Sequence, residues 1–186
     1  RIVAAPTAGA CGVLPAVLVP YFQKRCRNTD KILKAMYVAA GIGQIIATRS
    51  SISGAAGGCQ AEIGSASSMA AGALTYLQGG NCEQIATAAA MAMKNLLGLV
   101  CDPVAGLVEV PCVKRNVIGT VNAMACADMA MAGITSRIPP DQVMDAMKEV
   151  GDKMDASLRE TALGGLARTE EGVKIAEKMH ASQENW

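Results

Sequence analysis

The amino-acid sequence predicts an all-α fold. Apolar residues recur at helical spacing, helix-capping residues stand between these segments, and no stretch alternates apolar and polar residues as a strand does. Hydrophobic residues make up 51% of the sequence and aromatic residues only 3%, so the core must consist of Ala, Val, Ile, Leu and Met. Small side chains let helices approach closely, and methionine can fill irregular gaps. We therefore expect residues 1–186 to form a single compact helical domain with cysteine-bearing loops.

The first helix is expected after the segment APTAGACG. Thr7 is a candidate to cap it, because a side-chain hydroxyl can accept a hydrogen bond from an unpaired N–H group of the first turn. Pro20 should kink or end this helix near Tyr21, since proline lacks the N–H group that the helix needs. The polar segment from Lys24 to Asp30 then forms a turn.

Two longer helices follow. Apolar residues recur at helical spacing from Lys31 to about Thr48, and Thr29 or Asp30 stands where an N-cap is expected. The segment from Gln60 to Leu77 is rich in Ala and Ser. A neighbouring helix can pack at short distance against such small residues, so this segment is predicted to be the central helix.

The second half of the chain has clear helix boundaries. Asn81 and Gln84 have the spacing of a capping box for a helix that ends near Leu97. Prolines and glycines between Gly98 and Pro111 predict a loop. Further helices are expected from Val113 to Met131, from Ile138 to about Met154, and from Thr169 to His180.

Three of the seven cysteines stand in segments that are poor helix formers. Cys59 lies within GAAGGCQAE, and Cys101 and Cys112 bracket the predicted loop. Segments of this kind lack local stability, and a metal or cluster would hold them because thiolates are strong ligands. The alternative is that these cysteines are buried and act as small apolar residues. Their spacing does not decide, since they lack the paired CxxC pattern.

Composition excludes several classes of partner and location. The formal net charge of +1 gives no sign of a nucleic-acid or acidic-membrane partner. No uninterrupted apolar run reaches the roughly 18 residues that a membrane span needs. An odd number of cysteines and the lack of a secretory signal pattern indicate a reducing compartment, so a cytoplasmic location is expected.

Three segments carry a resemblance to a known family: APTAGACGVLPAVL (5–18), SGAAGGCQAEIGSASSMAAGAL (53–74) and NLLGLVCDPVAGLVEVPCVKRN (95–116). They resemble the alpha subunit, or alpha domain, of the bacterial iron–sulfur L-serine dehydratases. The resemblance extends over nearly the whole chain. Alpha subunits of this family are longer upstream, which implies that the chain is the C-terminal part of such a subunit.

The resemblance implies a cofactor and its ligands. In the family, the cysteines of the matching motifs bind a [4Fe–4S] cluster, and these correspond here to Cys59, Cys101 and Cys112. Three thiolates leave one iron without a protein thiolate, and such an iron can act as a Lewis acid on the hydroxyl group of serine. The implied reaction is that of an L-serine ammonia-lyase, which forms pyruvate and ammonia in serine catabolism and gluconeogenesis without pyridoxal phosphate.

The resemblance also implies partners. Family members have a beta subunit or domain whose motifs are absent from this sequence. The surfaces left open should be apolar, so the chain is expected to associate with itself, as a homo-oligomer, or with the beta component.

Other polar residues have two interpretations each. Glu62 is a candidate catalytic base, but an ordinary ion pair with Arg49 or Lys94 is the favoured interpretation. Lys114 and Arg115 are candidates to bind a substrate carboxylate, although a solvated basic pair is more common. The sequence therefore assigns no catalytic base.

Two alternatives to a cluster-binding enzyme remain open. One is a non-catalytic all-α association domain with buried structural cysteines. The other is a Cys₃His zinc site formed by Cys59, Cys101, Cys112 and His180. The resemblance disfavours the zinc site, because His180 stands in none of its motifs.

Overall fold

The computed structural model describes residues 3–183 and confirms the all-α prediction. The α-helices of this part are α1 (Val13–Lys24), α2 (Thr29–Arg49), α3 (Gly54–Gly57), α4 (Ser65–Leu77), α5 (Cys82–Lys94), α6 (Cys112–Met131), α7 (Pro140–Lys153) and α8 (Glu170–Gln183). The shorter helical turns are η1 (Ala8–Ala10), the π-helical η2 (Gln60–Gly64), η3 (Val104–Gly106), η4 (Ala156–Leu158) and η5 (Gly165–Arg168). Within the described residues there is no β-strand, and no helix is both long and apolar enough to cross a membrane.

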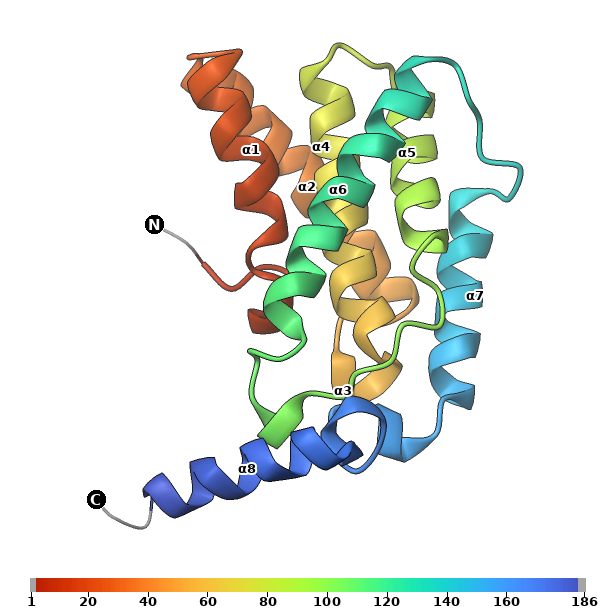
Figure 1. Cartoon of the computed structure of the whole chain (residues 1–186). Coiled ribbons are helices and arrows are strands. Elements are labelled where there is room, and N and C mark those ends of the chain that lie inside the picture. Colours follow the sequence, from red (N-terminus) through yellow and green to blue (C-terminus); the bar gives the residue numbers. More distant parts are fainter. Residues whose placement is uncertain (1–2, 184–186) are drawn as a thin grey trace.

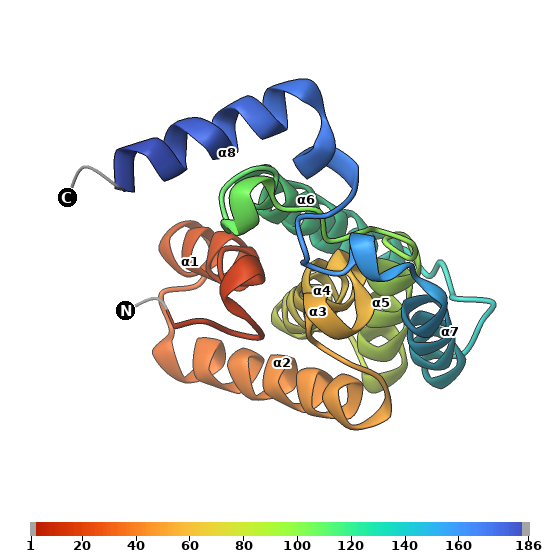
Figure 2. The same ribbon diagram turned by 90° about the horizontal axis from the view of Figure 1, so that it is seen from below.

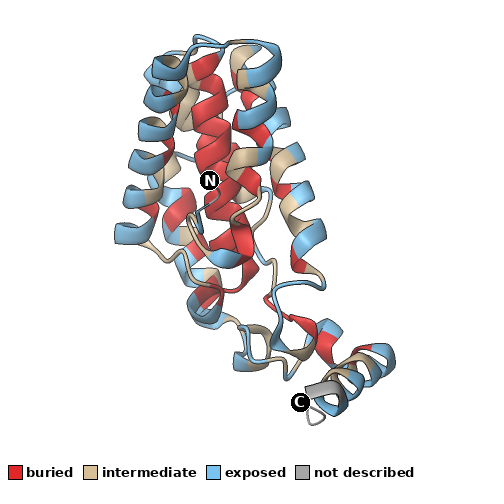
Figure 3. Ribbon diagram, turned by 90° about the vertical axis from the view of Figure 1, so that its left-hand side faces the viewer, coloured by how far each residue is buried: buried red, intermediate tan, exposed pale blue. Residues whose placement is uncertain are grey.

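Helix α4 lies at the centre of the bundle, with α1, α2, α5 and α6 packed around it (Figures 1 and 2). Every residue of α4 except Tyr76 is buried, which makes it the column of buried residues in Figure 3. Two of its serine hydroxyl groups have partners in the core: Ser67 donates to the carbonyl oxygen of Gly119 and Ser68 to that of Ala89. The prediction of a central helix is therefore confirmed, and η2 forms its first turn.

The N-terminal helices differ from expectation in three respects. Helix α1 does not end near Tyr21 but continues past Pro20 to Lys24, because packing against α4 and α6 compensates for one missing backbone hydrogen bond. Thr7 caps no helix, since its hydroxyl group donates to Glu62 instead. Helix α2 begins two residues earlier than expected, and its N-cap is Asn28.

The later helices agree closely with the sequence patterns. Asn81 and Gln84 form the predicted capping box of α5, which ends at Lys94 instead of Leu97. Helix α7 buries its apolar face against α5 and is joined to α2 by the ion pair between Arg49 and Asp145. Helix α8 crosses the end of the bundle where α3 and the loop between α5 and α6 also lie (Figure 1).

Candidate metal centre

A sharp turn after α3 directs Cys59 into the core. Gly58 has φ = 75°, in the left-handed region that favours glycine. A Cβ atom there would stand 2.6 Å from Sδ of Met154 and 3.0 Å from the carbonyl oxygen of Leu99. Cys59 follows directly and is buried. The glycine is thus required both by the backbone conformation and by the close packing around it.

Gln60 fixes the backbone beside Cys59. Its N–H group donates to the carbonyl oxygen of Leu99 (2.8 Å). Its side-chain Nε2 donates to the carbonyl oxygen of Met147 (2.9 Å), and its Oε1 accepts from the N–H group of Gly98 (2.9 Å). This buried amide therefore connects η2, α7 and the start of the loop that carries Cys101.

Cys101 is fixed through both of its backbone groups. Its N–H group donates to the carbonyl oxygen of Leu158, and its own carbonyl oxygen accepts from the N–H group of Glu160, each at 2.8 Å. The segment between α7 and α8 thus holds the cysteine loop through an isolated parallel β-bridge between Arg159 and Cys101. The Cys101 side chain is buried as a result.

A largely buried ion pair supports the same loop. Nη2 of Arg115 lies 2.9 Å from Oδ1 of Asp102, and its Nη1 donates to the carbonyl oxygen of Val100 (2.8 Å). Oδ2 of Asp102 accepts from the N–H group of Leu166 (2.8 Å). The interpretation of Arg115 as a solvated residue is therefore wrong, since its guanidinium group holds the loop between α5 and α6.

The side chains of two cysteines and one glutamate come together at the end of the bundle that carries these loops. Sγ of Cys59, Sγ of Cys101 and a carboxylate oxygen of Glu62 all lie within 4.8 Å of one another, and all three residues are buried. Across the described residues, no other set of His, Cys, Asp and Glu side chains is arranged in this way. Cys112 is also buried, at the start of α6, although it lies outside this close group. His180 is exposed on α8 and takes no part.

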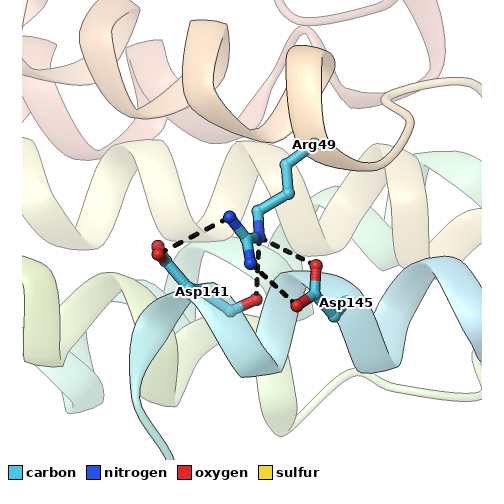
Figure 4. Close-up of polar contacts among 3 residues, drawn as sticks. All are labelled: Arg49, Asp141 and Asp145. Carbon is cyan, nitrogen blue, oxygen red and sulfur yellow. Dashed lines mark hydrogen bonds and ion pairs between the residues drawn. The ribbon is translucent and has the colours of Figure 1, made fainter.

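The ion pair expected for Glu62 is not formed. Arg49 instead pairs with Asp145 and Asp141 (Figure 4), and Lys94 contacts a serine hydroxyl. Glu62 is 7% exposed, and its Oε1 accepts a hydrogen bond from Oγ1 of Thr7 (2.5 Å). Burial raises the pKa of Glu62, and the hydrogen bond from Thr7 opposes this shift.

Glycine at position 54 leaves room for the close group. A Cβ atom there would stand 2.8 Å from Oε2 of Glu62 and 3.0 Å from Sγ of Cys101. These contacts are shorter than side chains tolerate. The carboxylate oxygen and the sulfur therefore border the same small space, which only glycine keeps open.

The thiols affect one another's ionisation. A hydrogen bond from Cys101 lowers the pKa of Cys59 against the effect of burial, and the positive charge of Arg115 lowers it further. The same hydrogen bond raises the pKa of Cys101, as burial also does. Burial and the negative charges of Cys59 and Glu62 raise the pKa of Cys112. Cys59 is therefore the first of the three to become a thiolate, and Cys112 lies within electrostatic reach of the same centre.

This donor set fits a metal group. Cysteine and glutamate side chains bind metals in their deprotonated forms. A metal cation would offset part of the negative charge that these buried groups then carry. Asn116 and Asn122 donate to backbone carbonyl groups, those of Gly9 and Ala92 among them. The large apolar groove between α1 and α2 is lined by none of the donor residues.

The sequence singled out Cys59, Cys101 and Glu62, but it did not predict that the Glu62 carboxylate lies beside the two sulfurs. The signal that could have found it is its spacing of three residues from Cys59, which places both side chains on one side of a helical turn. No local sequence pattern indicates that the Arg115 side chain reaches Asp102, because that contact depends on the path of the loop between them.

Fold and site together define an all-α protein with a candidate metal centre of two cysteines and one glutamate. Over residues 1–167 the chain matches the model of the family described as the serine dehydratase alpha chain. The chain belongs to this family. All the donor residues lie within the matched segment, and His180 lies outside it.

Named relatives agree with this family. The "Probable L-serine dehydratase, alpha chain" of Bacillus subtilis is 54% identical over 96% of this chain and 59% of the relative. The protein of the same name from Latilactobacillus sakei is 53% identical over 94% of this chain and 83% of the relative. "L-serine dehydratase TdcG" of Escherichia coli is 48% identical over 90% of this chain and 37% of the relative. The chain thus spans only part of these proteins.

Proposed function

We propose that this chain is the cluster-binding part of an L-serine dehydratase, and that the whole enzyme converts L-serine to pyruvate and ammonia. The observation that carries the proposal is the buried close group of Cys59, Cys101 and Glu62 in a member of the serine dehydratase alpha chain family. A structural role alone would not require a buried carboxyl group without a basic partner beside two thiols.

Cys59, Cys101 and Cys112 would hold a [4Fe–4S] cluster. When bound, such a cluster with one iron free of cysteine supplies a Lewis acid that favours departure of the serine hydroxyl group. The chain's own contribution is to position the donors: Gln60 fixes the backbone at Cys59, and Arg115 fixes the loop at Cys101. The burial of the donors keeps water from the site, and the proposed reaction needs no pyridoxal phosphate.

The complete enzyme would include the beta component and form an oligomer. Apolar side chains exposed along one face of α6 support association, because exposed apolar patches of this kind mark interaction surfaces. They include Val113, Val117 and Val121, each 60% exposed. We further propose a reducing, cytoplasmic location and a role in serine catabolism and gluconeogenesis. The absence of disulfides among the seven cysteines agrees with this location.

Anaerobic reconstitution with iron and sulfide tests the proposal. The chain should take up about four irons and turn brown. Cys59→Ala, Cys101→Ala and Cys112→Ala should each abolish iron uptake. Cys82→Ala, at the exposed start of α5, is the matched control and should leave iron uptake unchanged.

Two results would contradict the ligand assignment. One is loss of iron in Cys82→Ala or Cys26→Ala together with normal uptake in Cys101→Ala. The other is a colourless protein that binds one zinc ion and no iron, which would favour a zinc site instead.

A further inference from the structure

Glu62 has no role in the proposed set of three cysteine ligands, yet its environment is unusual for a carboxylate. It is 7% exposed and accepts one hydrogen bond, from Thr7. In the described part of the chain no lysine or arginine forms an ion pair with it. A buried carboxylate without a cation costs several kcal/mol on general grounds. The Glu62 carboxyl group therefore either keeps its proton or binds a cation that the protein itself does not supply.

Arg115, the basic residue that acts on the same centre, already has other partners. Arg115 lowers the pKa of Cys59, but its guanidinium group pairs with Asp102 and donates to the carbonyl oxygen of Val100. Close to Glu62 lie the sulfurs of Cys59 and Cys101. These sulfurs bind a metal as thiolates, so a metal that they hold would lie beside the Glu62 carboxylate.

Oε2 of Glu62 is the oxygen that points to the shared space. Thr7 donates to Oε1, which fixes the orientation of the carboxylate. Oε2 and Sγ of Cys101 both lie within 3.0 Å of the place where a Cβ atom of residue 54 would stand. Glycines at positions 9 and 54 allow this approach, since a Cβ atom at either would press against the carboxylate.

We propose that Glu62 is a fourth protein donor: before serine binds, its carboxylate would occupy the iron that none of the three cysteines holds, and the serine hydroxyl group would displace it. This inference rests on the proposed function. Together with Cys59, Cys101 and Cys112, it gives one protein donor for each of four irons. The carboxylate retains the iron that is otherwise most easily lost, and Thr7 is a positioning residue for it.

Glu62→Gln tests the inference on the full chain. The amide keeps the size of the side chain and can still accept the hydrogen bond from Thr7, but it is a poor metal ligand. After anaerobic reconstitution and brief exposure to air, the variant should lose one iron about tenfold faster than the wild type. Iron analysis and the EPR signal of a three-iron cluster measure this loss. Thr7→Val, which keeps the carboxylate, should show a smaller effect.

The outcomes separate this inference from the proposed function. Equal rates of iron loss in Glu62→Gln and wild type would overturn the role of Glu62 and leave the cluster in place. A wild-type chain that takes up no iron would overturn the proposed function instead. If the variant does not fold, a crystal structure of the anaerobically reconstituted wild type decides. An oxygen of Glu62 roughly 2.0–2.2 Å from an iron supports the inference, and one outside bonding distance overturns it.

Discussion

Asp102 and Arg115 illustrate how single residues hold the cysteine loop. Their side chains are only 5% and 13% exposed, respectively, and the guanidinium group also binds the carbonyl oxygen next to Cys101. A buried ion pair adds little net stability compared with apolar residues, but removal of one partner leaves an uncompensated charge in the core. The pair therefore fixes the shape of the loop more than it stabilises the fold.

Asp102→Asn should destabilise the chain by about 3–5 kcal/mol, because Arg115 would remain buried without its counter-charge. Urea denaturation followed by circular dichroism measures the free energy of unfolding. Asp128→Asn, an exposed change on α6, is the control and should change that free energy by less than about 0.5 kcal/mol. An equal effect of the two substitutions would contradict the role of the ion pair.

At the scale of elements, the contact between α3 and α7 positions Gln60 and therefore Cys59. A Cβ atom at Gly151 in α7 would stand 2.8 Å from Cα of Gly57 and 3.3 Å from Nε2 of Gln60. Backbone atoms of α3 cannot move aside as a flexible side chain can. The two helices can approach this closely only with glycine at position 151.

Gly151→Ala should therefore lower the free energy of unfolding. Overpacking costs roughly 1–3 kcal/mol, which exceeds the gain of up to about 1 kcal/mol from helix propensity. Gly41→Ala in α2, where a Cβ atom would meet nothing within 4 Å, should instead stabilise the chain. Chemical denaturation of both variants gives the comparison, and a stabilised Gly151→Ala variant would show that α3 and α7 are not in close contact.

Helices α2 and α7 are joined at the surface by Arg49, whose Nε and Nη2 each lie 2.8 Å from an oxygen of Asp145 (Figure 4). The hydrogen bonds from Arg49 lower the pKa of Asp145 below its ordinary value. A lowered pKa in the folded state means that the stabilisation is present above the unfolded-state pKa. It is lost as the pH falls through the folded-state pKa.

Asp145→Asn should accordingly cause a small decrease in stability at neutral pH, where the ion pair is solvent-screened. The difference from wild type should shrink towards zero as the pH falls below about 4. Denaturation midpoints measured across this range provide the test, with Asp152→Asn, which removes an exposed pair within α7, as the control. A difference that is independent of pH would rule out the ion pair as its cause.

The whole molecule presents an apolar face to its surroundings. Exposed valines follow one side of α6 at intervals of four residues, and they border a groove formed with η1 and α1. The candidate metal centre lies at the end of the bundle where α6 begins. A partner that covers this face would therefore lie next to the site.

The isolated chain, even after reconstitution with iron, should release pyruvate from L-serine slowly or not at all. Positioning of substrate and catalytic groups accounts for a large share of rate enhancement, and a site built from several segments loses it when segments are missing. Addition of the beta component should restore turnover. A lactate-dehydrogenase-coupled pyruvate assay measures this, and rapid turnover by the chain alone would show that residues 1–186 hold the whole substrate site.

Local patterns in the sequence determined the all-α class, the central position of the segment before Leu77 and the capping box at Asn81, because helical spacing and capping depend on residues a few positions apart. The cysteine-bearing motifs likewise identified the family by themselves. Only the tertiary structure decided that Glu62 lies with Cys59 and Cys101, and that Arg115 pairs with Asp102. The contact of Glu62 with Cys101 joins segments separated by α4 and α5, and that of Arg115 with Asp102 depends on the path of the loop before α6, so neither follows from a local pattern.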